Sequence, residues 1–221
     1  MRHGHNVTVL RYRLGPSSCS MRLAMRVLPA LRDHHVISGG SLKGRRRIVS
    51  EIVGRRCVRF SKGDEDAFVF HSAGEYIADP ETVGPFHYLW ETRQGMDDTE
   101  VFYSPGKIVA ELTATRGLDL ILSDRLPARP DCGRWQQAER SRRRRISAGP
   151  ARRGDAGRII GTLRAAADQF LVTRGRRRRT IVAGYPWFTD WGRDTMISLE
   201  GLTLARGEYS AAREILAAFA A

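Results

Sequence analysis

The chain has 221 residues, which is long enough for one or two domains with a sizeable core. It carries 37 Lys and Arg against 24 Asp and Glu, a net charge of +13, and nearly all of the positive charge is arginine. No apolar run reaches the length of a membrane span, and the N-terminus lacks the apolar core of a signal peptide, so we expect a cytoplasmic protein. Cys19, Cys57 and Cys132 are an odd number without CxxC spacing. That pattern disfavours a disulfide framework and a zinc site, and we expect no metal and no cofactor.

Arginine runs occur at 45–47, 142–145 and 176–179. Such runs favour nucleic-acid binding, which would depend steeply on salt. No helix-turn-helix, zinc-finger or RNA-recognition signature accompanies them, and they fall at apparent joints between elements. We therefore expect no specific nucleic-acid partner, and a basic nucleic-acid-binding domain remains one of the hypotheses in which the chain is not an enzyme.

The first part of the chain, residues 1–126, has the patterns of a β-rich domain. β-branched and aromatic residues, near-alternating polarity and Gly- or Asp-rich joints are typical of a β-sandwich. Ser104-Pro105-Gly106 predicts a turn, since Pro sets φ and Gly permits positive φ. The expected strands are 7–14, 21–28, 48–53, 56–60, 67–71, 86–93, 107–113 and 118–122.

From about residue 127 the composition changes. Residues 127–154 are Arg-dense and indicate a linker that merges into helix. Residues 155–173 carry apolar side chains at helical spacing behind Asp155 as N-cap, and end near Gly175. A second helix is expected to start near Asp190–Asp194, and a third near Glu208. Paired helices with short joints are typical of an α/α architecture.

The segment Gly184–Met196, GYPWFTDWGRDTM, concentrates aromatic, acidic and basic side chains. Aromatic faces can receive the C–H face of a sugar ring, and adjacent Arg and Asp side chains can bind vicinal hydroxyls. The alternative is purely structural: an aromatic loop over a helix start, with Arg193 and Asp194 as a salt bridge and Asp190 as the N-cap. Residue type alone leaves both interpretations open.

Residues 181–220, IVAGYPWFTDWGRDTMISLEGLTLARGEYSAAREILAAFA, closely resemble the start of the catalytic domain of glycogen debranching enzymes of the amylo-α-1,6-glucosidase type. VTVLRYRL, FHYLWETRQG and MDDTEVFYSPGKI resemble the N-terminal domain of the same family. The resemblance implies an α+β multidomain fold, in which a β-sandwich-like N-terminal portion (1–126) precedes the first helices of an (α/α)6 toroid (155–221). It also implies a glycogen, branched α-glucan or limit-dextrin substrate.

Glycosidic hydrolysis needs two carboxylates across the anomeric carbon, and Asp190 and Asp194, if they shared one helix face, would lie on the same side of the sugar. The resemblance implies instead that Arg193 and Asp194 hold the terminal glucose. With Trp187, Asp190 and Trp191 they form the predicted substrate-binding set. The resemblance places the catalytic acid and base downstream of Ala221, so we expect an inactive fragment of a debranching enzyme. The alternatives are another α/α-toroid hydrolase, acting on trehalose or an α-glucoside, and a non-catalytic carbohydrate-binding remnant.

Overall fold

The computed structural model describes residues 3–16, 19–33, 36–37, 39, 47–126, 130–148, 154–175, 178–185 and 188–220. The chain divides into two compact units, Met1–Cys132 and Gly133–Ala221, which we call the N-terminal and C-terminal units. The fold is mixed α+β, and the strands of its sheets pair antiparallel throughout the described residues.

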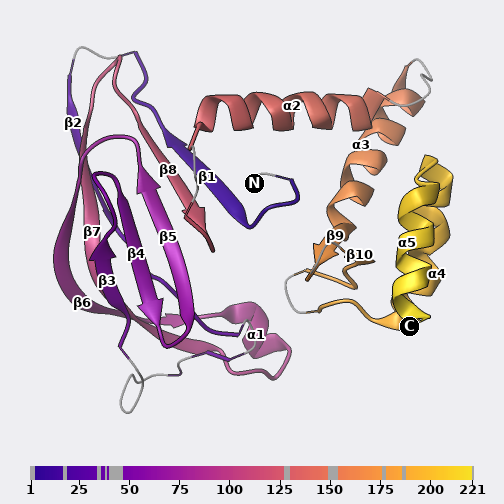
Figure 1. The fold of residues 1–221 in the computed structure, drawn as a ribbon, viewed down its shortest axis with the longest axis horizontal. Coiled ribbons are helices and arrows are strands. Elements are labelled where there is room, and N and C mark those ends of the chain that lie inside the picture. Colours follow the sequence, from indigo (N-terminus) through magenta and orange to yellow (C-terminus); the bar gives the residue numbers. More distant parts are fainter. Residues whose placement is uncertain are drawn as a thin grey trace. The chain divides into compact units, whose positions relative to one another are not determined.

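The N-terminal unit contains two sheets (Figure 1). One has five strands in the order β1-β8-β5-β4-β3, and the other has three in the order β2-β7-β6. The β-rich character expected for this part of the chain is therefore confirmed. The strands are β1 (Val7–Tyr12), β2 (Met21–Arg26), β3 (Val49–Ile52), β4 (Cys57–Lys62), β5 (Glu65–His71), β6 (Glu75–His87), β7 (Thr99–Leu112) and β8 (Leu118–Ser123).

Both sheets contribute side chains to one hydrophobic core. Alternate residues of a strand point to the same face, so β4, β7 and β8 each contribute residues two apart to this core. Its fully buried members include Phe60, whose ring meets that of Tyr76 edge-to-face at 5.9 Å. The buried core residues are Ile48, Val58, Phe60, Val69, Ile108, Ala110, Leu112, Leu118 and Leu120.

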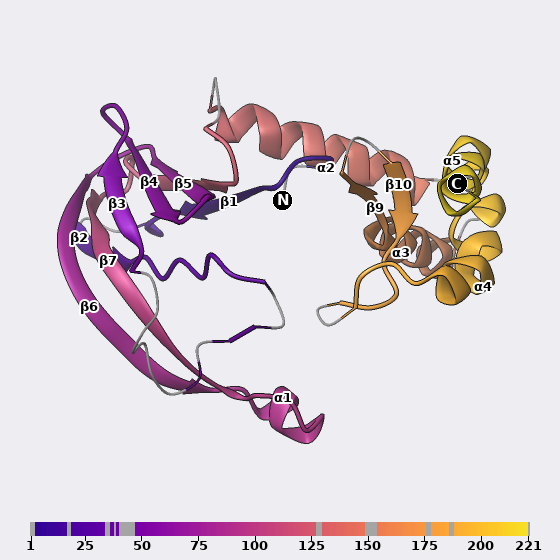
Figure 2. The ribbon, with the colours of Figure 1, turned by 60° about the horizontal axis from the view of Figure 1, so that its bottom comes forward.

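The long β6–β7 pair ends in the short helix α1 (Leu89–Arg93), as Figure 2 shows. A strand was expected over 86–93, and that prediction is wrong beyond His87, where β6 ends. The Thr92 hydroxyl donates to Asp98 Oδ2 at 2.6 Å, and Gly95 has a φ of +68°. These local contacts close a helical turn in place of a strand.

The turn expected at Ser104-Pro105-Gly106 is also absent, because these residues lie inside β7. They lie opposite an irregularity in the β6–β7 register between Ala78 and Glu81. An irregular register accommodates a proline within a ladder, since proline has no amide hydrogen to donate. Ser104 is fully buried and donates from its hydroxyl to the Gly106 carbonyl at 3.1 Å.

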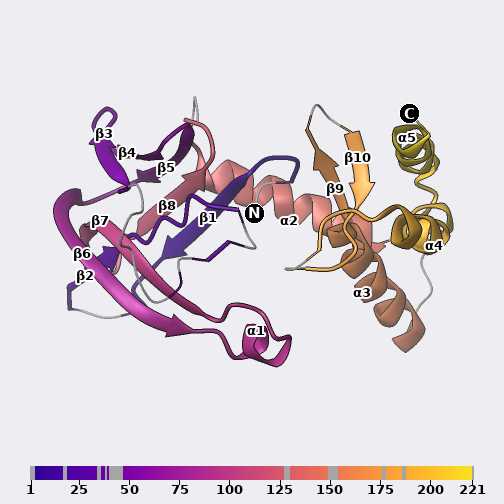
Figure 3. The ribbon, with the colours of Figure 1, turned by 90° about the horizontal axis from the view of Figure 1, so that it is seen from below.

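The C-terminal unit combines helices with a two-stranded hairpin, β9–β10, beside α3 (Figure 3). The Arg-dense stretch interpreted as a linker merging into helix forms the 17-residue helix α2. The next helix begins at Asp155 as expected, but its N-cap is Gly154 and it ends at Phe170, before the predicted end at 173. The elements are α2 (Cys132–Ala148), α3 (Asp155–Phe170), β9 (Leu171–Arg174), β10 (Arg178–Ile181), α4 (Gly192–Leu202), the 3-10 turn η1 (Leu204–Arg206) and α5 (Tyr209–Phe219).

Within the described part of the chain, no helix is both long enough and apolar enough to cross a membrane.

Candidate functional site

The aromatic and charged segment ends at the N-terminus of helix α4. Trp191 is the N-cap residue, with extended backbone (φ −121°, ψ 130°), and its carbonyl accepts the amide hydrogen of Thr195 at 2.8 Å. Asp194 lies in the first turn, where a negative charge interacts favourably with the helix dipole. The predicted helix start near Asp190–Asp194 is confirmed.

Three of the five predicted substrate-binding residues present their side chains to solvent here. Trp191 is 58% exposed. The side chains of Arg193 and Asp194 are 85% and 46% exposed, and Arg193 Nε lies 3.9 Å from Asp194 Oδ2. Such a long ion pair at the surface leaves both groups available to a ligand. Trp187 lies outside the described residues.

Asp190 differs from these three because its side chain is only 9% exposed. Arg174 Nη1, at the end of β9, donates to Asp190 Oδ1 at 2.6 Å. The Thr180 hydroxyl, on β10, donates to Oδ2 at 3.0 Å. Asp190 thus joins the chain just before α4 to both strands of the hairpin.

The hydrogen bonds also set the protonation state of Asp190. Burial by itself would raise the pKa of this carboxyl, but the hydrogen bonds from Arg174 and Thr180 stabilise the carboxylate and bring the pKa below its ordinary value. Asp190 precedes α4 and is not its N-cap residue, so the capping alternative is wrong. Asp190 and Asp194 also do not share a face of that helix, because only Asp194 belongs to it.

The loop before Asp190 is closed by backbone hydrogen bonds. The Ala183 amide donates to the Thr189 carbonyl at 2.9 Å, and the Phe188 amide donates to the Gly184 carbonyl at 2.9 Å. The Tyr185 hydroxyl donates to the Gln169 carbonyl at 3.0 Å, which ties the loop to α3. Tyr185 and Phe188 remain more than half exposed, so the loop presents aromatic surface beside the helix start.

A pocket of about 440 Å³ lies next to Asp190. Its volume is within the range of small-molecule sites. It combines the ring of Phe219, at the end of α5, with guanidinium, hydroxyl and carboxylate groups. The lining residues are Arg174, Gly175, Arg179, Thr180, Asp190, Ala218 and Phe219. Of the four predicted site residues that the structure describes, only Asp190 lines this pocket.

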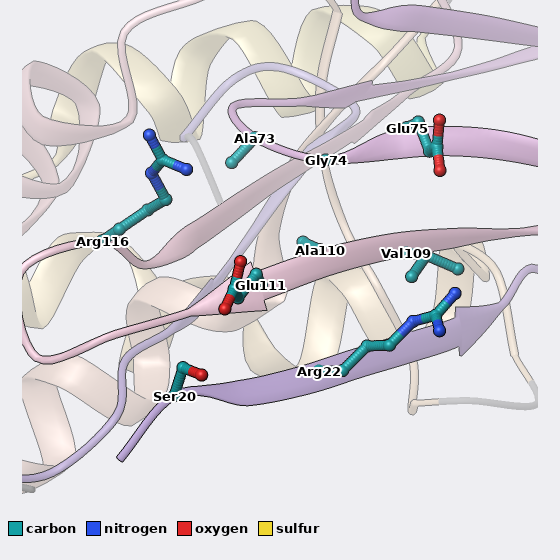
Figure 4. A pocket seen from close by; sticks show the side chains of 9 residues that line it. All are labelled: Ser20, Arg22, Ala73, Gly74, Glu75, Val109, Ala110, Glu111 and Arg116. Atoms are coloured by element: carbon teal, nitrogen blue, oxygen red, sulfur yellow. The ribbon is translucent and has the colours of Figure 1, made fainter. Parts of the chain in front are cut away.

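A second pocket, of about 590 Å³, lies on the three-stranded sheet of the N-terminal unit (Figure 4). Arg22 of β2 and Glu111 of β7 are direct partners in the register. Figure 4 shows their charged ends pointing apart, with Glu75 and Arg116 across the opening. None of the predicted site residues that the structure describes lines this pocket.

The arginine run of α2 makes intramolecular ion pairs. Arg142 binds Glu139 at 2.9 Å and Asp168 of α3 at 2.7 Å, and Arg143 binds Glu139 at 2.8 Å. The Arg142–Asp168 pair thereby links α2 to α3, whereas the pairs with Glu139 lie within α2. Across the residues with a described position, no three His, Cys, Asp or Glu side chains are placed to hold a metal ion.

Family models match both the N-terminal and the C-terminal part of the chain. Residues 1–118 match the family model described as "Glycogen debranching enzyme N terminal", and residues 165–221 match "Amylo-alpha-1,6-glucosidase". The first match alone covers more than half of the chain. The chain belongs to the glycogen debranching enzyme family. No curated protein and no solved structure matches it.

Trp191, Arg193 and Asp194, the exposed residues at the start of α4, lie within the amylo-α-1,6-glucosidase match. The resemblance drawn from the motifs is confirmed. Sequence reasoning missed Arg174 and Thr180, the partners of Asp190, because they belong to the unpredicted β9–β10 hairpin. The adjacent β-branched residues Val172 and Thr173 were the available signal, although the arginine run 176–179 that follows obscured it.

Proposed function

We propose that this chain carries the glucose-binding part of an amylo-α-1,6-glucosidase, the debranching activity that hydrolyses single α-1,6-linked glucose stubs. The proposed partner is glycogen, another branched α-glucan or a limit dextrin. The observation that carries the proposal is the simultaneous exposure of Trp191, Arg193 and Asp194 at one helix start, within the segment that matches the glucosidase family.

These residue types suit the end of a glucan branch. A guanidinium donates several hydrogen bonds in a fixed plane, and a carboxylate accepts them, so Arg193 and Asp194 together can bind neighbouring hydroxyl groups. The indole of Trp191 offers a flat apolar face to the C–H side of the same sugar. We assign Trp187 the same kind of contact on the resemblance alone.

We further propose that this block binds the sugar and that it does not supply the catalytic pair. A glycosidase acid needs a raised pKa, and its partner carboxylate lies across the scissile bond at roughly 5–9.5 Å. Asp190 has the opposite environment, since the hydrogen bonds from Arg174 and Thr180 hold its pKa down. Asp190 is therefore unsuited to the role of the acid, and we propose that the chain binds branched glucan without hydrolysing it.

Two assays on the purified chain test this proposal. Glucose release from a branched limit dextrin is expected to equal that of the buffer control. Binding to the same limit dextrin, measured by affinity electrophoresis, is expected to be competed by an α-1,6-linked glucose disaccharide and not by trehalose. Glucose release that Asp194→Asn abolishes would place a catalytic carboxylate in the block. Competition by trehalose alone would favour a different hydrolase of the α/α type, and absence of binding would refute the proposal.

A further inference from the structure

We propose that Asp190 is a positioning residue that fixes the start of α4, and that it does not contact the sugar. This inference rests on the proposed function, because what it positions is the glucose-binding set Trp191, Arg193 and Asp194. It departs from the motif-based expectation, which grouped Asp190 with the ligand-binding side chains.

The first argument is that the carboxylate of Asp190 is already occupied. Each of its oxygens accepts a hydrogen bond, from Arg174 at 2.6 Å and from Thr180 at 3.0 Å, and the side chain is 9% exposed. Asp194, by contrast, is 46% exposed. A sugar hydroxyl that bound Asp190 would have to displace either the charge-assisted hydrogen bond from Arg174 or the part-buried hydrogen bond from Thr180.

The second argument is that strand β10 holds the helix start at two adjacent residues. Thr180 is hydrogen-bonded to Asp190, which precedes α4, and the next residue, Ile181, is hydrogen-bonded to Thr195 of α4. Thr195 is fully buried on α4, and its hydroxyl donates to the Ile181 carbonyl at 3.5 Å. The contact at Asp190 precedes the glucose-binding set in the chain, and the contact at Thr195 follows it. Together they restrict the position and the direction of the first turn of α4.

Helix α5 lies beside the same turn. A Cβ added to Gly192, the first residue of α4, would make ordinary van der Waals contact with the ring of Phe219, at 3.6 Å. A small misplacement of a binding residue has large effects on ligand binding and reaction, so a side chain that fixes this turn affects the site without touching the ligand.

Thr180→Val removes the hydroxyl at nearly constant shape. In the full chain it is expected to weaken binding of a maltooligosaccharide with one α-1,6-linked glucose by about 10-fold, measured by calorimetry. Thr180→Ser keeps the hydroxyl and is expected to bind as the wild type does. Thr173→Val is the matched control, since Thr173 is an exposed residue on the paired strand β9. Equal affinity of Thr180→Val and the control would overturn the inference.

A double mutant distinguishes positioning from direct contact. If Asp190 acts only through the glucose-binding set, Thr180→Val is expected to cause a smaller loss in an Asp194→Asn background than in the wild type, because one of the positioned contacts is already gone. Additive losses would instead assign Asp190 or Thr180 to the ligand. If Asp194→Asn alone leaves the affinity unchanged, the proposed function fails, and this inference fails with it.

Hydrogen exchange gives a readout that needs no ligand. In Thr180→Val the Thr195 amide, which closes the first turn of α4, is expected to exchange faster than in the wild type, while amides in the middle of α5 keep their rate. Unchanged exchange at Thr195 would show that the Asp190 contacts do not hold the helix start. Faster exchange throughout the unit would show a general loss of stability and would equally overturn the positioning role.

Discussion

Arg193 and Asp194 are neighbours in the sequence, yet Arg193 Nε and Asp194 Oδ2 are 3.9 Å apart and both side chains face solvent. An exposed pair at that separation contributes at most about 1 kcal/mol to the free energy of unfolding. Substitution of either residue is therefore expected to leave the fold intact. This property makes the pair suitable for functional tests, since a loss of binding will not reflect unfolding.

The N-terminal unit contains a buried ion pair, in contrast to the exposed pair of Arg193 and Asp194. Glu100 is 2% exposed, and both of its oxygens bind Arg32 at 2.7 Å, while the Tyr88 hydroxyl donates to one of them at 2.9 Å. Glu100→Gln would remove the buried carboxylate from its hydrogen-bonded ion pair with Arg32, and is expected to lower the free energy of unfolding by about 3–5 kcal/mol. Urea denaturation followed by far-UV circular dichroism measures this loss.

The control for this prediction is Glu51→Gln. Glu51 pairs with Arg59 at the surface, with side chains 58% and 40% exposed, so its loss is expected to cost less than about 1 kcal/mol. Similar denaturation midpoints for the two variants would contradict the distinction between the buried and the exposed pair.

Acid is expected to weaken the C-terminal unit through Glu139. Hydrogen bonds from Arg142 lower the pKa of Glu139 from 4.5 to about 2. Burial of the carboxyl opposes this shift, and a hydrogen bond from Arg143 adds to it. Because the folded pKa lies below the unfolded one, this stabilisation is complete above pH 4.5 and is lost as the pH falls toward 2. Solvent screening reduces it to on the order of 1–2 kcal/mol.

Melting temperatures of the wild type and Glu139→Gln, compared from pH 6 to pH 2, measure this contribution. The wild type is expected to melt higher at pH 6, and the difference is expected to shrink below pH 4. Asp155→Asn serves as a control, because its ion pair with Arg158 is almost fully exposed. A difference between wild type and Glu139→Gln that does not change with pH would contradict the assignment.

The buried thiols are expected to react slowly with a thiol reagent. Burial, supported by the neighbouring Asp119 carboxylate, raises the pKa of Cys132 to about 11, and burial raises the pKa of Cys57 as well. The reactive thiolate is thus scarce at pH 8, whereas Cys19 is exposed. Labelling of the native protein at pH 8, followed by peptide mass spectrometry, is expected to modify Cys19 well before the other two. Comparable labelling of Cys132 would contradict its burial.

Helix α3 presents an apolar face to solvent, with Ile159 and Leu163 one turn apart and 60% and 63% exposed. Exposed apolar surface of this kind binds hydrophobic dyes and favours association. Ile159→Lys together with Leu163→Lys is expected to reduce dye fluorescence and association in light scattering, without lowering the melting temperature. Unchanged dye fluorescence in the double variant would show that this face does not cause dye binding.

The sequence predicted local structure better than tertiary contacts. The strand patterns around Val9 and Leu120 and the helical spacing of Ile160, Leu163 and Phe170 indicated the elements directly, because the spacing of apolar residues differs between strands and helices. The hairpin β9–β10 was missed, since four-residue strands rich in arginine lack a clear alternation. The role of Asp190 depends on side chains ten and sixteen residues away, and no local pattern encodes such a partnership.

The central claim is that Arg193 and Asp194 bind the glucose at the end of a branch, and calorimetry with a maltooligosaccharide bearing one α-1,6-linked glucose tests it most directly. Asp194→Asn keeps the shape and removes the charge, and is expected to weaken binding by about 30-fold, or about 2 kcal/mol, with an unchanged melting temperature. Asp155→Asn, which removes a first-turn charge from another helix, is expected to bind like the wild type. Wild-type affinity in Asp194→Asn would contradict the account and leave the pair as a salt bridge at a helix start.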